Sequence, residues 1–197
     1  MNSWKDTKNN DWHIHPSGDS ERNYFISGLE SAYMIVKTLD YPYNKKVFEY
    51  GCGNGRIMKH LQALNISGCD INENYVNQAK NNKLDVELLE NFNKYNFDIC
   101  YSYTVFIHLN LEDSKIALKY IHDRLKKGGL AYLQIPIYDT NRRGGSYIDV
   151  NTMCYDTFKN TVENIGFKIV EYHTNKGSFN YTNIGLNHDK FQILMKN

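Results

Sequence analysis

The most constraining feature of the sequence is a run of glycines that directly follows a short apolar segment. Residues 47–55 read Val-Phe-Glu-Tyr-Gly-Cys-Gly-Asn-Gly. The apolar part predicts a strand, and Gly51, Gly53 and Gly55 let the main chain turn sharply and let a ligand lie against it. We expect a helix after this loop, with its amino end and the backbone N–H groups facing the ligand. Such a loop between a strand and a helix indicates a site for a nucleotide-type cofactor.

The rest of the chain alternates between apolar segments of strand length and segments with helical spacing. We expect strands over residues 46–50, 66–70, 84–89, 97–101, 130–135, 167–173 and 189–195. We expect helices over residues 19–39, after the glycine loop, and over 73–81, 111–126 and 154–164. This alternation predicts an α/β fold, in which a mostly parallel sheet carries helices on both faces. The last two strands have no helix between them, so we expect them to be antiparallel.

Several local signals fix the expected boundaries. Asn110 is a suitable amino cap for the helix over 111–126, and Gly128-Gly129 is expected to close it. Residues 139–152 are expected to form a polar loop. In the first helix, three- and four-residue steps predict an apolar face made of Phe25, Leu29, Ala32, Tyr33, Val36 and Leu39.

Composition narrows the function classes. The 197 residues suit one domain, and the formal net charge of +1 argues against a nucleic-acid partner. No apolar run reaches the roughly 20 residues that a membrane helix needs, and the polar amino terminus does not resemble a signal peptide. The four cysteines are scattered, which favours a reduced, cytoplasmic protein without a metal site.

The spacing of the glycines separates two kinds of cofactor. A dinucleotide fingerprint would place its third glycine at position 56, where this chain has Arg56. The run instead reads E-x-G-x-G-x-G from Glu49, which resembles motif I of the class I S-adenosylmethionine (SAM) methyltransferases. Asp70 ends the second strand, where a carboxylate can accept hydrogen bonds from both ribose hydroxyls. Its alternative role is to cap the following helix.

The resemblance continues in order over roughly residues 45–136. Asp70 matches motif II, Asp98 and His108 match the family's motif IV stretch, and residues 125–136 (LKKGGLAYLQIP) match the segment before strand five. The resemblance implies a Rossmann-like sheet of seven strands with an antiparallel last strand. It also implies SAM as cofactor and S-adenosylhomocysteine as product. The implied cofactor-binding residues are Glu49, Gly51, Cys52, Gly53, Gly55, Asp70, Ile71, Glu90, Asn91, Phe92, Tyr101 and Ser102.

The domain prediction and the roles outside the cofactor site are less constrained. We expect a single domain over 1–197, with an N-terminal lid or helix segment over 1–44 and the core over 45–197. His108 is the candidate general base, because histidine titrates near neutrality, or it orders its loop. Tyr103 is a second candidate. The expected acceptor-binding residues are Trp12, Tyr24, Arg142, Arg143 and Tyr147.

Three functions compete. A methyltransferase acting on an O or N atom of a small molecule, such as a sugar or a secondary metabolite, leads. The Asn/Asp-Pro-Pro-aromatic motif of DNA-base and glutamine methyltransferases is missing after residues 97–101. The alternatives are methylation of RNA or protein, and a non-catalytic SAM-binding partner of another enzyme. A dehydrogenase is disfavoured by the glycine spacing. The sequence predicts neither the acceptor nor the oligomeric state.

Overall fold

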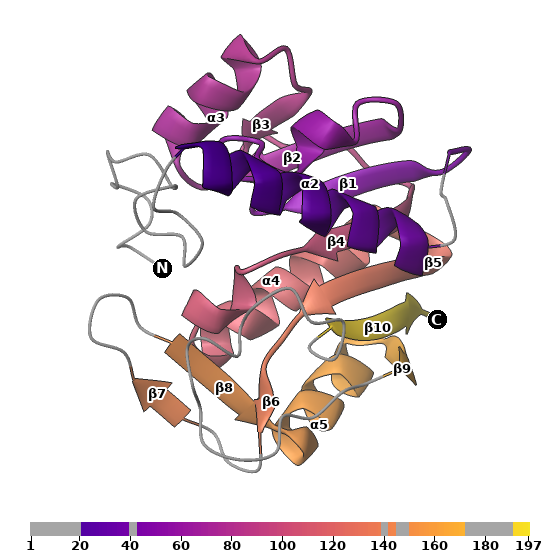
Figure 1. Ribbon diagram of the computed structural model, residues 1–197. Coiled ribbons are helices and arrows are strands. Elements are labelled where there is room, and N and C mark those ends of the chain that lie inside the picture. The colour runs from indigo at the N-terminus through magenta and orange to yellow at the C-terminus, as the bar shows by residue number, and fades with distance from the viewer. Residues whose placement is uncertain (1–20, 40–42, 139–141, 145–149, 172–190) are drawn as a thin grey trace. The chain divides into compact units, whose positions relative to one another are not determined.

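The computed structural model describes residues 21–39, 43–138, 142–144, 150–171 and 191–197 (Figure 1). The chain divides into two compact units, Asn2–Asn93 and Lys94–Asn197, and each is described by itself. We call them the N-terminal unit and the C-terminal unit. The single domain over 1–197 stays a prediction.

The N-terminal unit holds three parallel strands in the order β3-β2-β1. In the register of β1 and β2, Lys46 lies opposite Asn65 and Tyr50 opposite Cys69. A buried cluster around Met58, Val76 and Leu84 packs the unit. Its elements are α2 (Glu21–Thr38), β1 (Lys46–Tyr50), the 3-10 turn η2 (Met58–His60), β2 (Asn65–Asp70), α3 (Glu73–Asn81) and β3 (Val86–Leu88).

Helix α3 has the bounds that the sequence predicts. Asn72 is its amino cap, and its side-chain oxygen accepts hydrogen bonds from the N–H groups of Asn74 at 2.9 Å and Tyr75 at 3.2 Å. This cap satisfies two N–H groups that have no partner within the helix, so α3 begins directly behind the end of β2.

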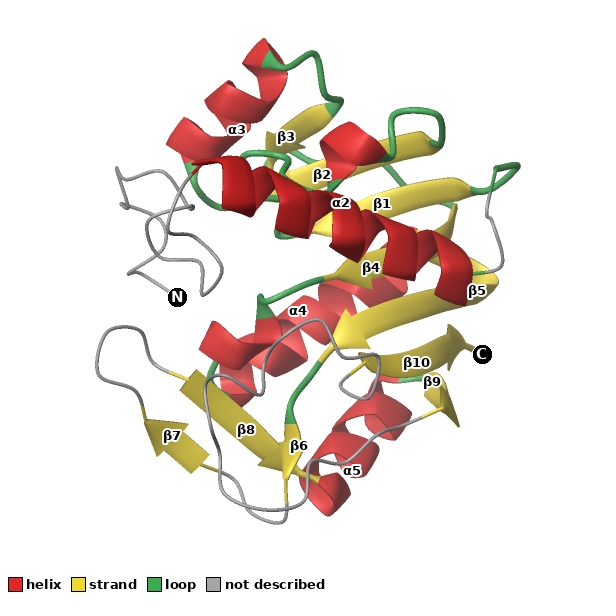
Figure 2. Cartoon of the chain, viewed as in Figure 1, coloured by secondary structure: helices red, strands yellow, loops and turns green. Residues whose placement is uncertain are grey.

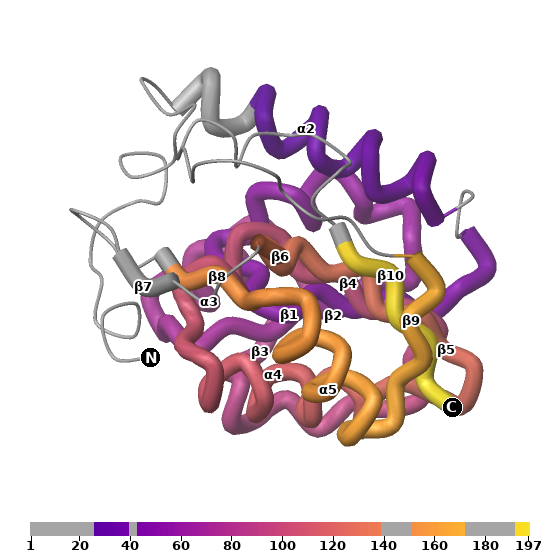
Figure 3. The backbone as a smooth tube through the Cα atoms, turned by 90° about the horizontal axis from the view of Figure 1, so that it is seen from below, coloured from indigo at the N-terminus to yellow at the C-terminus, as the bar shows by residue number. Residues whose placement is uncertain are grey.

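The C-terminal unit holds four strands of the main sheet, in the order β4-β5-β10-β9, and a small sheet in the order β6-β8-β7 (Figure 2). Strand β10 lies between β5 and β9 and is antiparallel to both (Figure 3). Its elements are β4 (Phe97–Ser102), η3 (Phe106–His108), α4 (Leu111–Arg124), β5 (Leu125–Gln134), β6 (Ile137–Tyr138), β7 (Arg142–Gly144), β8 (Val150–Cys154), α5 (Tyr155–Ile165), β9 (Phe167–Glu171) and β10 (Phe191–Lys196).

These strands confirm the predicted fold class. Over the described residues the fold is α/β, with seven strands in a mostly parallel sheet and an antiparallel last strand. Within the described ranges, no helix is long and apolar enough to cross a membrane.

The prediction of a helix after the glycine loop is wrong. Between Gly55 and Asn65 the chain forms only the turn η2, and most of its backbone hydrogen bonds join a residue to the third one before it. Ile57, at the amino end of this turn, offers no side-chain cap. The apolar residues of this segment are buried from a compact turn rather than from one face of a helix.

The glycines expected to end α4 serve another purpose. Helix α4 ends at Arg124, and Leu125 already pairs with Phe97 in the sheet. Lys196 on β10 caps the helix instead, donating to the carbonyls of His122 at 2.9 Å and Leu125 at 2.8 Å. Gly128, with φ of +74°, lies where the register between β4 and β5 shifts. The pair therefore forms an irregularity within a strand.

Two further expectations need correction. The segment 139–152, expected to be a polar loop, contains β7 and the beginning of β8. The expected apolar face of the first helix is only partly buried, because Ala32 is buried but Leu29 and Tyr33 are 55% and 59% exposed. Besides Ala32, α2 buries Ser27, Gly28, Ser31 and Ile35. Small side chains let the main chain of α2 lie close to the residues that it packs against. A rule based on the spacing of apolar residues does not detect such a face.

Candidate cofactor and active site

The glycine loop is folded as the sequence predicts, but its hydrogen bonds differ from the expectation. Gly51, Gly53 and Gly55 have φ values of +75°, +53° and +82°, which glycine adopts without strain. The N–H groups of Gly51 and Cys52 donate to the carbonyl of Cys69 at 2.8 and 3.0 Å, and that of Gly55 donates to Cys52. The N–H of Gly53 donates to Asp70 Oδ2 at 2.8 Å. These four donors are engaged within the protein, so the expectation that they face a ligand is wrong.

Asp70 joins the glycine loop to the turn after β2. Its Oδ2 accepts from Gly53, and its Oδ1 accepts from the N–H of Asn72 at 2.9 Å. The side chain is half-buried, as is that of Ile71. A carboxylate can accept up to about four hydrogen bonds, so a side chain of this type can bond both to its own loop and to ligand hydroxyls. The helix-capping role belongs to Asn72, which removes the alternative interpretation of Asp70 as a helix cap.

Two carboxylates make the surroundings of the loop electronegative. Cys52 is buried, and its pKa is raised well above the ordinary thiol value by burial, then by the charges of Asp70 and Glu49. Glu49 is itself buried at the end of β1. The same field that disfavours a thiolate favours a cation beside the loop.

Not every glycine of the loop is available to a ligand. A Cβ atom on Gly55 would lie 2.1 Å from Leu84 Cδ1, so this glycine is required for packing against Leu84. Gly51 and Gly53 are half-buried. A ligand can therefore reach the main chain at Gly51 and Gly53, whereas Gly55 packs against the core.

The residues after β3 divide into two groups. Glu90 and Asn91 are exposed. Phe92 is fully buried, and its ring centroid lies 5.9 Å from that of Phe48 on β1. The packing gives Phe92 a core role and leaves Glu90 and Asn91 as the accessible polar groups of this turn.

The end of β4 contains a contact that the sequence does not reveal. Tyr101, Ser102 and Tyr103 are buried. Thr104 follows with φ of +57°, a value that is unusual for a β-branched residue. Its N–H donates to Oε1 of the buried Gln134 on β5 at 2.8 Å. In the sequence, nothing distinguishes Gln134 from other strand residues. The contact is found only in the structure, where Thr104 has a positive φ.

His108 is the last residue of η3 and is half-buried. Its N–H donates to the carbonyl of Val105 at 2.9 Å, which closes the short turn. Two residues later, Asn110 caps α4 and accepts from the N–H of Asp113 at 2.9 Å, as predicted. The segment from Thr104 to His108 is thus held at both ends.

The predicted acceptor-binding residues lie largely outside the described part of the chain. Trp12 and Tyr147 are outside it entirely. Tyr24 is in α2, and Arg142 and Arg143 are in β7, but their side chains are not described. Within the described ranges, no group of three His, Cys, Asp or Glu residues could hold a metal ion.

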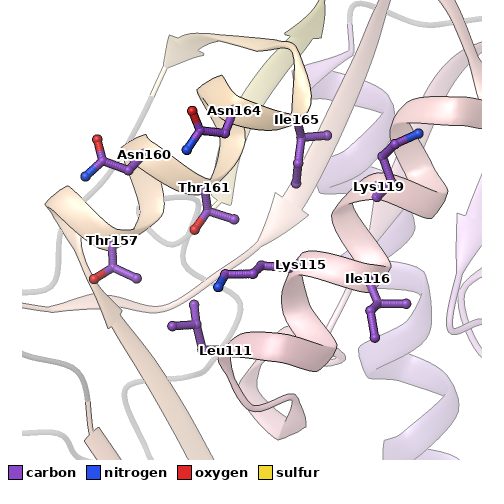
Figure 4. A pocket seen from close by; sticks show the side chains of 9 residues that line it. All are labelled: Leu111, Lys115, Ile116, Lys119, Thr157, Asn160, Thr161, Asn164 and Ile165. Carbon is purple, nitrogen blue, oxygen red and sulfur yellow. The ribbon is translucent and has the colours of Figure 1, made fainter.

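A groove of about 770 Å³ lies between α4 and α5 (Figure 4). Two lysines on its α4 side are paired with acids of the same helix, Lys115 with Glu112 at 2.7 Å and Lys119 with Asp123. Its lining comes from two helices rather than from strand ends, so it does not coincide with the predicted site. The lining residues are Leu111, Lys115, Ile116, Lys119, Thr157, Asn160, Thr161, Asn164 and Ile165.

Comparison with known proteins agrees with this fold. Residues 48–133 match the methyltransferase domain family. A phosphoethanolamine N-methyltransferase from Plasmodium falciparum is 32% identical over 120 residues, which cover 54% of this chain. The match spans 45% of the length of that protein.

Two solved structures share the fold. The magnesium protoporphyrin IX methyltransferase from Synechocystis PCC 6803, with bound SAM, has a TM-score of 0.65 at 16% identity, over 95% of this chain and 90% of that one. A TehB-like SAM-dependent methyltransferase from Corynebacterium glutamicum has a TM-score of 0.58 at 19% identity, over 85% of this chain and 88% of that one. The domain match and the shared fold agree with the resemblance of the sequence motifs to the class I SAM-dependent methyltransferases.

Proposed function

We propose that the protein binds SAM at the glycine loop and transfers its methyl group to an O or N atom of a small molecule. S-adenosylhomocysteine would be the second product.

The proposal rests on two features of the glycine loop. Four of its N–H groups donate to protein atoms, and two carboxylates lie near it. A pyrophosphate needs backbone donors and a positive field, whereas four donors of this loop bond to protein atoms. Burial is the main cause of the raised pKa of the Cys52 thiol, and the negative charges of Asp70 and Glu49 add to it. SAM carries a sulfonium and an ammonium group, so this field attracts it and repels a phosphate.

The roles of the cofactor-binding residues follow from their positions. Asp70 would accept from the ribose hydroxyls, and Ile71 would lie against the adenine ring. Glu90 or Asn91 would contact the adenine amino group. Gly51 and Gly53 would let the methionine part lie against main chain. The remaining residues would shape the site from within the core: Glu49, Cys52, Gly55, Phe92, Tyr101 and Ser102.

The catalytic roles rest on the segment that Gln134 and Asn110 hold in place. When bound, SAM supplies an electrophilic methyl group. The protein has to align the acceptor atom with that group and exclude water. His108 would take the proton from an acceptor whose pKa is too high for it to ionise unaided. Tyr103, which is 6% exposed, is the second candidate.

The acceptors of two similar proteins support a small acceptor for this one. One is a phosphoethanolamine N-methyltransferase and the other a magnesium protoporphyrin IX methyltransferase, so the fold accepts small molecules of different kinds. Trp12, Tyr24, Arg142, Arg143 and Tyr147 remain the proposed acceptor-binding residues. Two arginines suit an acceptor with a phosphate or carboxylate group. The four cysteines form no disulfide, which supports a reducing, cytoplasmic location.

One observation favours a second candidate, a SAM-binding partner protein without turnover. The carboxylates and the glycine loop all belong to the N-terminal unit, whereas His108 belongs to the other. Most of the proposed cofactor contacts therefore do not involve the segment that carries His108. Binding of SAM without methylation of any acceptor in a metabolite extract would favour this candidate.

Substitution of Asp70 tests the proposal. Asp70→Ala removes a carboxylate from the ribose hydroxyls and from Gly53, and the loss of such bonds costs about 1.5–3 kcal/mol each. We expect SAM affinity, measured by calorimetry, to fall at least about tenfold. Asp85→Asn is the control, since Asp85 accepts from Ser67 Oγ at 2.6 Å and is not part of the loop. Unchanged SAM affinity in Asp70→Ala would reject the assignment.

A further inference from the structure

Helix α2 approaches the end of the glycine loop unusually closely. A Cβ atom on Gly28 would lie 2.5 Å from the carbonyl oxygen of Arg56 and 2.9 Å from its Cγ. The flanking residues of the buried face are also small, with Ser27 and Ser31 only 3% and 1% exposed. The main chain of α2 therefore rests directly on residue 56, which follows the last glycine of the loop.

A buried charge joins the same two segments. Arg56 is 6% exposed, and its Nη1 donates to Ser27 Oγ at 3.0 Å. Ser31 Oγ in turn donates to the carbonyl of Ser27 at 2.8 Å, which fixes this turn of the helix. Burial of a guanidinium is costly unless it is hydrogen-bonded, so the contact with Ser27 is a strong constraint on where α2 lies.

We propose that this contact is a clamp that holds the glycine loop in its binding conformation, with Arg56 and Ser27 as positioning residues for the cofactor. The inference rests on the proposed function, because it assigns a cofactor-related role to residues that do not themselves touch the cofactor. The clamp is defined as Ser27, Gly28 and Arg56.

The physical reason is the conformational freedom of glycine. A loop with glycine at every second position loses more backbone entropy on ordering than a loop of the same length without glycine. If the loop were ordered only on binding, that loss would weaken cofactor affinity. The clamp fixes Arg56, the residue next to Gly55. The N–H of Gly55 donates to the carbonyl of Cys52, and its carbonyl accepts from the N–H of Lys59. It therefore orders the loop before the cofactor arrives.

The clamp is tested by three substitutions with matched controls. Arg56→Met keeps the apolar stem but removes the donors, and Ser27→Ala removes the acceptor. Gly28→Ala places a methyl group against the Arg56 carbonyl. As a control for crowding, Ser27→Thr keeps the hydroxyl and adds a methyl group at this buried position. Ser31→Ala removes only the bond within the helix and should leave the loop unaffected.

Two measurements are made on each variant. Hydrogen exchange in the ligand-free protein should speed up at least about fivefold for the amides of residues 51–55 and stay unchanged in β2. Calorimetry should show SAM affinity about five- to tenfold weaker in Arg56→Met and Ser27→Ala. The double variant should be no weaker than Arg56→Met alone, because both changes break one contact.

The outcomes separate the clamp from the proposed function. If thermal stability falls but loop exchange and SAM affinity match the wild type, the contact is only structural and the clamp is wrong. If the wild type fails to bind SAM while loop exchange still responds, the proposed function fails, and the contact orders the loop without a role in SAM binding. If Arg56→Met does not fold, Ser27→Ala, which loses a single hydroxyl, decides the question.

Discussion

Two loops at the ends of strands solve the same conformational problem with different residues. The loop after β1 takes positive φ at Gly51, Gly53 and Gly55, where it carries no steric cost. The segment after β4 takes positive φ at Thr104, where a branched side chain makes it costly. The first loop bonds to main chain and to Asp70, and the second bonds to the amide of Gln134.

The comparison shows which kind of strain a sequence reveals. A glycine in the sequence indicates such a turn, because a positive φ favours glycine. Thr104 persists in its conformation only because neighbouring groups hold it, and such residues concentrate at functional sites. This supports the assignment of catalysis to the segment that contains His108. Four predictions test the contrast, from the largest expected effect to the smallest.

The first prediction concerns the second loop. If His108 is the general base, His108→Ala should lower turnover by about 10²-fold or more, while SAM affinity stays within about twofold. Wild-type turnover should fall in acid, and the variant should lose that dependence. The measurement is initial rate against pH, with SAM affinity by calorimetry as the control. Equal rates in the two proteins across pH would remove His108 as the base.

The second prediction concerns the first loop. Gly55→Ala combines a positive φ with a methyl group 2.1 Å from Leu84 Cδ1, so we expect a loss of about 2–4 kcal/mol in the free energy of unfolding.

Gly128→Ala is the matched control for this change. Gly128 has φ of +74°, but a Cβ there would meet no atom within 4 Å, so only the backbone cost of about 1–2 kcal/mol remains. Urea denaturation of both variants measures the difference. Equal losses would show that Leu84 yields and that packing does not require Gly55.

The third prediction concerns the support of Thr104. Gln134→Leu removes the acceptor of a partly buried N–H and should cost about 1–3 kcal/mol of unfolding free energy. Gln134→Glu retains an acceptor oxygen and should cost less. Urea denaturation checks both changes. If the two variants are equally stable, the contact between Thr104 and Gln134 does not hold the segment.

The fourth prediction compares two thiols. Burial and the charges of Asp70 and Glu49 raise the pKa of Cys52, whereas hydrogen bonds from Thr157 lower the pKa of Cys154. At neutral pH iodoacetamide should therefore alkylate Cys154 first, as measured by mass spectrometry of peptides over time. Faster alkylation of Cys52 would contradict the negative field around the glycine loop.

Much of the fold could be predicted because local signals and packing agree. Asn72 and Asn110 cap their helices with their own side chains, and the bounds of α3 were predicted to the residue. The bounds of β1 were also predicted, since its apolar run ends directly at the first glycine. The antiparallel pairing of β9 and β10 followed from the missing helix between them.

The errors arose where distant residues decide the outcome. Helix α4 ends because Lys196, which is far away in sequence, caps it. Helix α2 buries Ser27 and Gly28 where Arg56 lies against them, and the side chains of Leu29 and Tyr33 remain exposed. In the candidate site, the position of Asp70 could be predicted, but its bond to Gly53 and the role of Gln134 depend on tertiary packing.

The central claim is that the glycine loop holds a cationic adenosyl donor rather than a dinucleotide. Calorimetric titration of the wild-type protein with SAM and, separately, with NAD tests it most directly. The account predicts that SAM binds and that NAD, which carries a pyrophosphate, does not. Binding of NAD, or no binding of SAM at millimolar concentration, would contradict it.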